Sequence, residues 1–88
     1  MIISQSGIDI TRRFFDAIDI LARDGKIRGL QTFTKKHGIN RWNLITVKNK
    51  PQNTILKCEY VAYLCNDYNI SPKWILLGKG YFYDTLQD

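Results

Sequence analysis

Side chains that could contact nucleic acid are clustered in the stretch GINRWNLITVKNKP, residues 38–51. Arginine can form a bidentate hydrogen bond with guanine and asparagine can do the same with adenine, so Arg41 and Asn43 are suited to reading bases. Two lysines that follow, Lys48 and Lys50, are suited to phosphate contacts. The alternative is that the stretch is the solvated outer face of an ordinary amphipathic helix, with lysines near the negative end of its dipole.

The positive charge of the chain is concentrated around this stretch. The formal net charge is +5, with 13 Lys and Arg against 8 Asp and Glu. Residues 30–57 contain no acidic residue and six basic ones: Lys35, Lys36, Arg41, Lys48, Lys50 and Lys57. A local field of this sign favours polyanions, with nucleic acid first and an anionic membrane surface second. A lysine-rich face that only keeps the protein in solution would have the same composition.

Length and composition favour binding over catalysis. A chain of 88 residues, 44% of them hydrophobic, is expected to form one domain over residues 1–88, with an ordered core at about residues 9–80. The sequence has no paired acids, no nucleophile and base spacing and no phosphate-binding glycine loop. No apolar run approaches the roughly 20 residues that span a bilayer, and the amino terminus lacks a signal-peptide pattern. We therefore expect a cytoplasmic protein that is not an enzyme, does not bind a membrane and uses no cofactor.

The cysteines and the single histidine do not indicate a metal site. Cys58 and Cys65 are seven residues apart, which on a helix separates them by about 10 Å along the axis. That exceeds the spacing of a disulfide, so both are expected to be reduced core residues. One histidine, His37, is too few for a common zinc set, and we expect it to be structural or to lie near a phosphate.

Apolar periodicity predicts five short helices and no strand, so the expected fold is all-α. The first helix is expected over residues 9–25, with Asp9 or Thr11 as its cap. The others are expected over residues 30–37, 41–48, within 55–69, and 72–77. Asn40 should cap the third helix, and Ser71 followed by Pro72 should begin the fifth. The apolar residues of the last segment are expected in the core: Trp74, Leu76 and Leu77.

The second and third helices match the spacing of a helix-turn-helix. This motif needs a small residue in its first helix, a glycine at the turn and an aliphatic residue in its second helix. Thr34, Gly38 and Leu44 occupy these positions, and Val47 completes the inner side. In such a motif the second helix lies in the major groove of DNA and the first crosses the backbone.

The helix order, the segment HGINRWNLITVKN and the closing segment NISPKWILLGKG resemble the DNA-binding domains of phage-type helix-turn-helix repressors of the Cro class, the lambda-repressor-like family. The resemblance covers residues 10–80 and implies a compact five-helix bundle that binds double-stranded DNA. The end of the chain at Asp88 suggests the short, Cro-like form. The sequence departs from the family at Leu30, where glutamine is frequent, and at Lys48 and Lys50, where glutamate and glycine are common.

The resemblance also implies a set of DNA-binding residues. The start of the first motif helix would contact phosphates, the start of the recognition helix would read bases, and the residues after it would lie along phosphates. The predicted set is Gln31, Thr32, Asn40, Arg41, Trp42, Asn43, Thr46, Lys48, Asn49 and Lys50. For Trp42 two interpretations stay open, a contact with DNA or a half-buried position beside the fourth helix, and Ile45 is treated in the same way.

Two functions follow as hypotheses. The first is a sequence-specific transcriptional regulator, a repressor of phage or mobile-element type, that binds double-stranded DNA as a homodimer. Dimerisation is expected because one short recognition helix reads few base pairs, whereas two half-sites about 34 Å apart read enough. The tail YFYDTL, residues 81–86, or the fifth helix could supply the dimer contact. The alternative is a protein-interaction module, an antitoxin or adaptor, that uses Trp42 and Ile45 as its docking patch.

Overall fold

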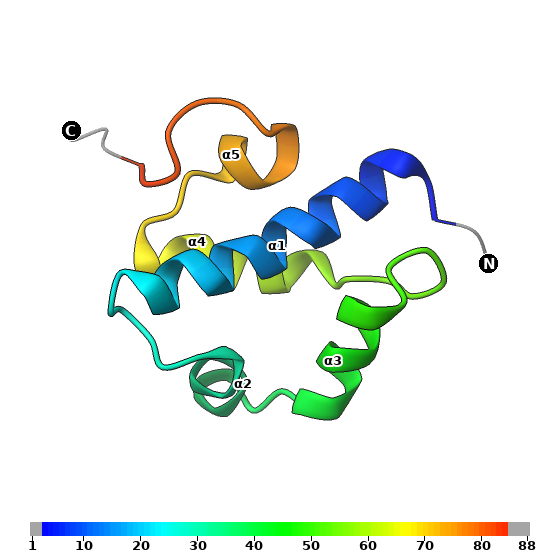
Figure 1. Ribbon diagram of the computed structural model, residues 1–88, viewed down its shortest axis with the longest axis horizontal. Helices are drawn as coiled ribbons and strands as arrows, with labels where there is room; N and C mark the ends of the chain where they lie inside the picture. Colours follow the sequence, from blue (N-terminus) through cyan, green and yellow to red (C-terminus); the bar gives the residue numbers. More distant parts are fainter. Residues whose placement is uncertain (1–2, 85–88) are drawn as a thin grey trace.

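The computed structural model describes residues 3–84, and they form a compact all-helical globule (Figure 1). The helices are α1 (Gln5–Arg23), α2 (Leu30–His37), α3 (Arg41–Asn49), α4 (Cys58–Tyr68) and α5 (Pro72–Leu77). Within the described part of the chain there is no strand, only an isolated bridge between Ile70 and Tyr83. The all-α prediction is therefore confirmed.

The first helix begins earlier than the sequence predicts. Ser4, and neither Asp9 nor Thr11, is its cap: the Ser4 hydroxyl oxygen accepts a hydrogen bond from the backbone N–H of Gly7 at 3.1 Å. Thr11 lies inside the helix, buried, and its hydroxyl donates to the carbonyl of Gly7 at 3.0 Å. The prediction was wrong because the first turn of the helix is polar and shows little apolar periodicity. A serine cap is nevertheless sufficient to begin a helix there.

The predicted bounds of α2 and α3 are confirmed to within one residue. Gly38 ends α2 in the left-handed conformation, with φ of 64°, where a residue with a Cβ would be strained. Its backbone N–H donates to the carbonyl of Thr34 and so closes the last turn of the helix. The chain can therefore reverse direction within three residues and enter α3.

One hydrophobic core holds the helices together. Its most deeply buried members come from all five helices and from the turn before α5: Phe14, Leu21, Phe33, Leu44, Leu64, Ile70 and Ile75. Phe14 makes an edge-on ring contact with Phe33, at 5.6 Å between centroids, which joins α1 to α2. Leu44 is 1% exposed and joins α3 to the same cluster.

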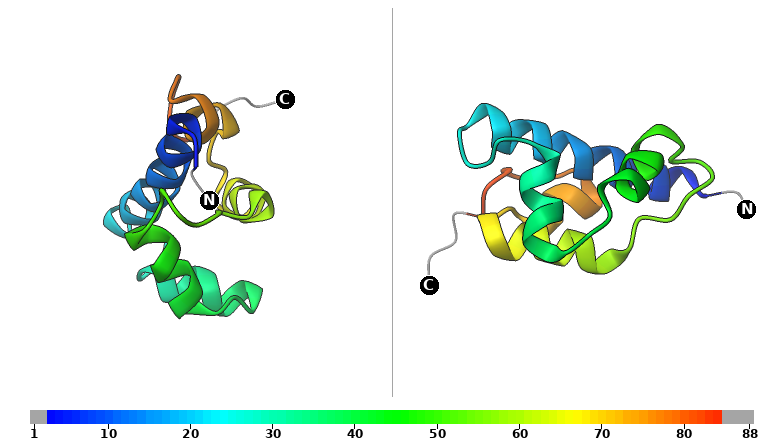
Figure 2. Two further views of the ribbon diagram at one scale, coloured as in Figure 1. Left: turned by 90° about the vertical axis from the view of Figure 1, so that its right-hand side faces the viewer. Right: turned by 90° about the horizontal axis from the view of Figure 1, so that it is seen from below.

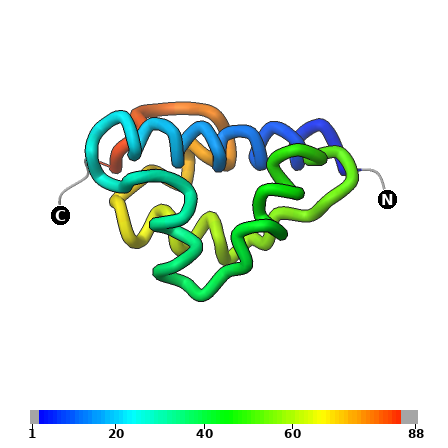
Figure 3. Tube along the Cα trace, turned by 60° about the horizontal axis from the view of Figure 1, so that its bottom comes forward, coloured from blue at the N-terminus to red at the C-terminus, as the bar shows by residue number. Residues whose placement is uncertain are grey.

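The helices are arranged so that α2 and α3 form one end of the molecule. In Figure 1, α1 crosses the centre, α4 lies beside it, α5 lies above it, and α2 and α3 lie below it. Figure 2 shows from the side that α2 and α3 project away from α4 and α5. In Figure 3, the two helices meet at a corner formed by the turn around Gly38. One flank of this helix pair therefore remains uncovered.

The core prediction for the last helix was partly wrong. Ile75 is its buried residue, whereas Leu76 is 44% exposed and Leu77 is 62% exposed. Trp74 is partly buried and packs against the core, with its ring 4.7 Å from that of Phe82. In a helix of six residues only one narrow stripe can face inward, so a run of adjacent apolar residues cannot all be buried.

The cysteine prediction also needs a correction. Both cysteines are free, as expected, but Cys58 is exposed at the first residue of α4 and only Cys65 packs against the core. Burial raises the pKa of the Cys65 thiol, with a smaller contribution from the charge of Asp84. Cys58 was expected in the core because it shares a helix side with Cys65, but it is the first residue of α4 and lies three residues before Val61, where burial of the helix begins.

Candidate nucleic-acid interface

The start of α3 is fixed by its cap. The side-chain oxygen of Asn40 accepts hydrogen bonds from the backbone N–H groups of Trp42 at 2.9 Å and Asn43 at 3.1 Å. This satisfies two of the amide groups that a helix otherwise leaves unpaired at its amino terminus. The oxygen of Asn40 is therefore occupied, and only its side-chain amide nitrogen remains for a contact outside the protein.

The three residues after the cap point outward. Arg41, Trp42 and Asn43 are exposed, whereas Leu44 is buried and Val47 packs against the core. Thr46 is also exposed, but its hydroxyl donates to the carbonyl of Trp42 at 3.0 Å. The outer side of α3 thus presents a guanidinium, an indole and a carboxamide in succession, next to a threonine one turn later.

Trp42 does not fill a gap beside α4, so that interpretation was wrong. Its side chain is 68% exposed, and the guanidinium carbon of Arg41 lies 5.1 Å from its ring centroid. At this distance the cation is attracted by the face of the ring, which holds the two side chains together in solvent. Ile45 differs from Trp42 because it is only half-exposed.

A second basic surface lies at the start of α2. A hollow of about 460 Å³ is lined there by polar and basic side chains: Arg28, Gln31, Thr32, Lys35 and Lys36. The Thr32 hydroxyl accepts a hydrogen bond from the backbone N–H of Arg28 at 3.2 Å, which ties the preceding loop to the helix. Gln31 is exposed. The positive end of the α2 dipole adds to the field of these cations.

Arg28, Lys35 and Lys36 are absent from the predicted set of binding residues. Lys35 and Lys36 belong to the acid-free stretch that the sequence already shows, so the charge pattern could have indicated them. Arg28 lies two residues before that stretch, and the hydrogen bond from its backbone N–H to Thr32 holds it beside α2. Lys36 is partly neutralised, since its amine nitrogen lies 3.5 Å from a carboxylate oxygen of Asp67.

The residues predicted to contact phosphates at the end of α3 and after it lie in different surroundings. Lys48 turns back toward α1, with its amine nitrogen 6.0 Å from the ring centroid of Phe15, whereas Asn49 and Lys50 are exposed. The carbonyl of Lys50 accepts hydrogen bonds from the Thr54 hydroxyl at 2.7 Å and the Asn53 N–H at 3.1 Å. The loop after α3 is thereby held in a defined turn.

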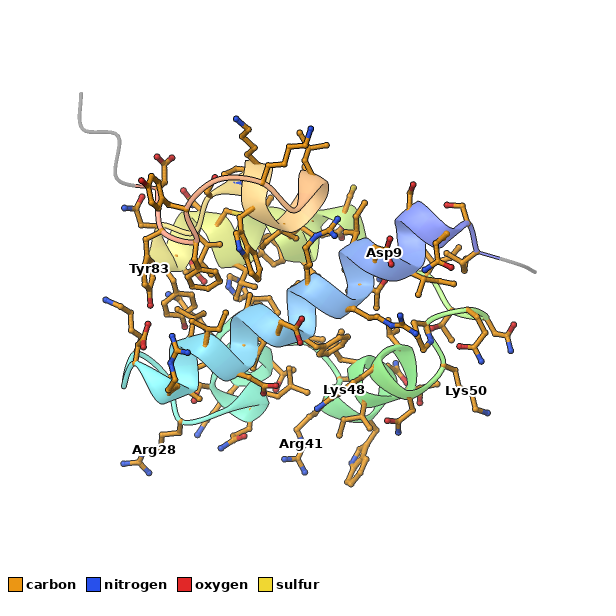
Figure 4. The ribbon with its side chains drawn as sticks, turned by 45° about the horizontal axis from the view of Figure 1, so that its top comes forward. Asp9, Arg28, Arg41, Lys48, Lys50 and Tyr83 are labelled. Carbon is orange, nitrogen blue, oxygen red and sulfur yellow. The ribbon has the colours of Figure 1, made fainter. Side chains whose placement is uncertain are left out.

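The basic side chains share one side of the molecule. Figure 4 shows Arg28, Arg41 and Lys50 along the edge formed by α2 and α3, whereas Asp9 and Tyr83 lie on other parts of the surface. Among residues 3–84 the ion pairs involve Arg23, Lys36 and His37, so Arg28, Arg41 and Lys50 take part in none of them. The cations on this edge are available to an anionic partner.

His37 is a structural residue. Its ring is stacked on that of Tyr63, and its Nε2 lies 2.6 Å from a carboxylate oxygen of Asp67. Both partners belong to α4, so His37 joins α2 to α4. Of the two roles that the sequence allows for His37, the structural one is confirmed.

Comparison of the chain with protein-family models, with curated proteins and with solved structures finds no match. None of the helices within residues 3–84 is both long and apolar enough to cross a membrane.

Proposed function

We propose that this chain is a helix-turn-helix protein of the lambda-repressor-like type that binds double-stranded DNA sequence-specifically and regulates transcription, as a repressor of phage or mobile-element type. The observation that carries the proposal is the outer side of α3, where Arg41, Trp42 and Asn43 are exposed directly after a well-formed cap. These residue types, at the start of a helix that projects from the molecule, suit the major groove.

The charge distribution supports the same proposal. The exposed cations Arg28 and Lys50 lie on opposite sides of Arg41 (Figure 4), so phosphates that flank a groove would meet positive charge at each end. Contacts of this kind position the protein on the duplex, whereas the residues of α3 would select the sequence. The roles divide into phosphate binding by α2 and the loop after α3, and base reading by α3.

A homodimer is part of the proposal. A single short helix reads too few base pairs for useful specificity, and two copies related by a two-fold axis double the site. Leu77 and Tyr81 are 62% and 82% exposed at the end of α5 and just after it, which makes them suitable for a contact between copies. Residues 85 and 86 of the tail that could contribute to this contact lie outside the described residues.

The experiment that tests this function is selection of bound duplexes from a random library at a stated salt concentration. Binding to the selected duplex should weaken steeply with salt, because about 0.9 counterions are released for each phosphate neutralised. Arg41→Ala and Asn43→Ala should each lower the preference for the selected sequence by about 1 to 3 kcal/mol. Lys50→Ala should weaken binding to all sequences equally and reduce the salt slope by about 1.

Lys73→Ala is the matched control for Lys50→Ala, because it removes the same charge from an exposed position in α5, on the other side of the molecule. It should leave the salt slope unchanged. Equal effects of the two variants, or affinity that does not depend on salt for any duplex, would show that the α2 and α3 surface does not bind DNA.

The exposure of Trp42 favours a second candidate, a protein-interaction module such as an antitoxin or adaptor. A large aromatic side chain paired with Arg41 is the kind of anchor that dominates protein interfaces. In that case Trp42→Ala should abolish binding to a partner protein. The double variant Arg41→Ala and Asn43→Ala should not change the affinity for duplex DNA, because the unchanged chain does not bind it.

A further inference from the structure

An apolar groove lies on another part of the surface from the proposed DNA interface. It has a volume of about 450 Å³ and is formed by the first half of α1, residues 54–56, α4 and two residues of α5, Pro72 and Leu76. In the left view of Figure 2 these segments lie above α2 and α3. A volume of this size is within the range of small-molecule pockets, roughly 300 to 1,000 Å³.

The chemistry of the walls restricts what could bind there. No residue that lines the groove carries a charge, although the chain as a whole has a net charge of +5. The hydroxyls of Thr11 and Thr54 are already used, since they donate to the carbonyls of Gly7 at 3.0 Å and Lys50 at 2.7 Å. The remaining polar groups among the lining side chains are the thiols of Cys58 and Cys65, and thiols form only weak hydrogen bonds.

Two small residues, Gly7 on α1 and Ala62 on α4, are among those that line the groove. Ile55 and Leu76 form apolar edges that are 60% and 44% exposed. Filling the groove would remove this apolar surface from water, which is favourable in proportion to its area. A ligand with an uncharged hydrocarbon surface would therefore suit these walls.

From this geometry we propose that the groove binds an uncharged, predominantly hydrocarbon small molecule. A second copy of the chain is a less suitable occupant. A stable interface buries about 800 Å² on each partner, and the most exposed apolar side chains near α5, Leu77 and Tyr81, do not line the groove. The surface suited to another copy and the groove suited to a small molecule are therefore different places.

The groove is also connected to the end of α3. Residues 54–56 form one of its walls, and Thr54 is hydrogen-bonded to Lys50, immediately after α3. The backbone N–H of Ile3, another lining residue, donates to the carbonyl of Gln52 at 3.0 Å. A molecule in the groove would contact both sides of this loop and stabilise it.

The test is titration of the full chain with N-phenyl-1-naphthylamine, an uncharged aromatic probe whose fluorescence rises in apolar surroundings. We expect one probe per chain, and slower alkylation of Cys58 and Cys65 by iodoacetamide when the probe is bound. Ala62→Phe fills the groove from an exposed helix position and should weaken probe binding by about tenfold or more. Glu59→Phe adds the same ring at an exposed position of α4 that does not line the groove, so it is the control and should change probe binding by less than about twofold.

Ile55→Asp is a second variant, in an exposed position outside the helices, and it should also weaken binding because it places a charge at the apolar edge. Absence of probe binding, unchanged affinity in both groove variants, or loss of binding in Glu59→Phe would overturn the proposal. A ratio of one probe to two chains, with Ala62→Phe monomeric by sedimentation, would show instead that a second copy occupies the groove. The assay contains no DNA, so its result does not depend on the proposed function.

Discussion

The imidazole ring of His37 lies parallel to the phenol ring of Tyr63, with 4.2 Å between the ring centroids and 3° between the planes. A carboxylate oxygen only accepts hydrogen bonds, so the 2.6 Å contact with Asp67 is one in which His37 Nε2 donates. Phe33, one turn earlier on the same side of α2, is buried, and its ring centroid lies 5.1 Å from that of His37. The ion pair of Lys36 with Asp67 also joins α2 to α4, so His37 acts together with Lys36 to hold the first helix of the proposed motif in position.

His37→Ala should therefore destabilise the protein. The substitution removes the stacked ring and the hydrogen bond to Asp67, at an expected cost of about 2 kcal/mol in the free energy of unfolding. Urea unfolding followed by far-ultraviolet circular dichroism measures it. Lys35→Ala, at an exposed position of the same helix, is the control and should change the free energy by less than about 0.5 kcal/mol. Equal losses in the two variants would exclude a specific role for the His37 contacts.

Asn40→Ala should destabilise α3 by removing its cap. Loss of the bonds to the N–H groups of Trp42 and Asn43 is expected to cost about 1 kcal/mol of unfolding free energy. Asn40→Ser should retain most of the stability, because serine is also a good cap. Comparing the urea midpoints of the two variants checks this. If both variants also bind a selected duplex equally well, Asn40 acts only as a cap.

The sequence predicts α2 and α3 well because their boundaries depend on local chemistry. Asn40 caps α3 and Gly38 ends α2 through interactions within a few residues, and such interactions are visible in the order of residue types. The inward position of Leu44 also follows from periodicity. The all-α class and the outward position of Arg41 and Asn43 could therefore be predicted before any coordinates.

Contacts between residues far apart in the sequence could not be predicted. Asp67 lies 30 residues after His37, and no spacing rule relates them. The sequence also does not show which apolar residue of the short α5 is buried. The segment PKWILL has apolar residues at four adjacent positions, and only its packing against α1 decides that Ile75 is the buried one. The exposure of Trp42 is of the same kind, since a half-buried indole and an exposed one have the same sequence signature.

Tyr83 should make the unfolding free energy of the protein depend on pH in the alkaline range. Its hydroxyl donates to a carboxylate oxygen of Asp24 at 2.7 Å; burial first, and then this hydrogen bond, raise the pKa of Tyr83 from 10.0 to about 12. Because the folded state holds the phenolic proton more tightly than the unfolded state, the stabilisation is complete below pH 10 and is lost as pH rises toward about 12. The unfolding free energy should decline over this window, and Tyr83→Phe should reduce the decline.

Absorbance at the phenolate band, compared between the natural chain and Tyr83→Phe, would locate this titration. Tyr81→Phe is the matched control because Tyr81 is the exposed tyrosine two residues away. The same hydrogen bond lowers the pKa of Asp24, so its stabilisation is present above pH 3.8 and is lost as pH falls through the lower, folded value. A decline of stability at high pH that is equal in all three proteins would contradict the role of Tyr83.

Arg13 should be essential for the position of α5. Its guanidinium donates to the carbonyls of Ile75 and, at 3.0 Å, of Leu76, two acceptors that the end of a short helix leaves free. Arg13→Ala should lower the unfolding free energy by about 2 kcal/mol, and Arg13→Lys should recover only part of it because an ammonium does not reproduce the planar fork. Arg12→Ala, at the exposed neighbouring position, is the control.

A double-mutant cycle with Gly78 tests the same contact from the other side. Gly78 has φ of 68°, and a Cβ there would lie 3.1 Å from a terminal nitrogen of Arg13. Gly78→Ala should therefore cost about 1 kcal/mol for the left-handed backbone and more for crowding of the guanidinium. In the Arg13→Ala background the crowding is absent, so the cost should fall by about 0.5 kcal/mol or more. Strictly additive free energies in urea unfolding would show that Arg13 does not pack against the end of α5.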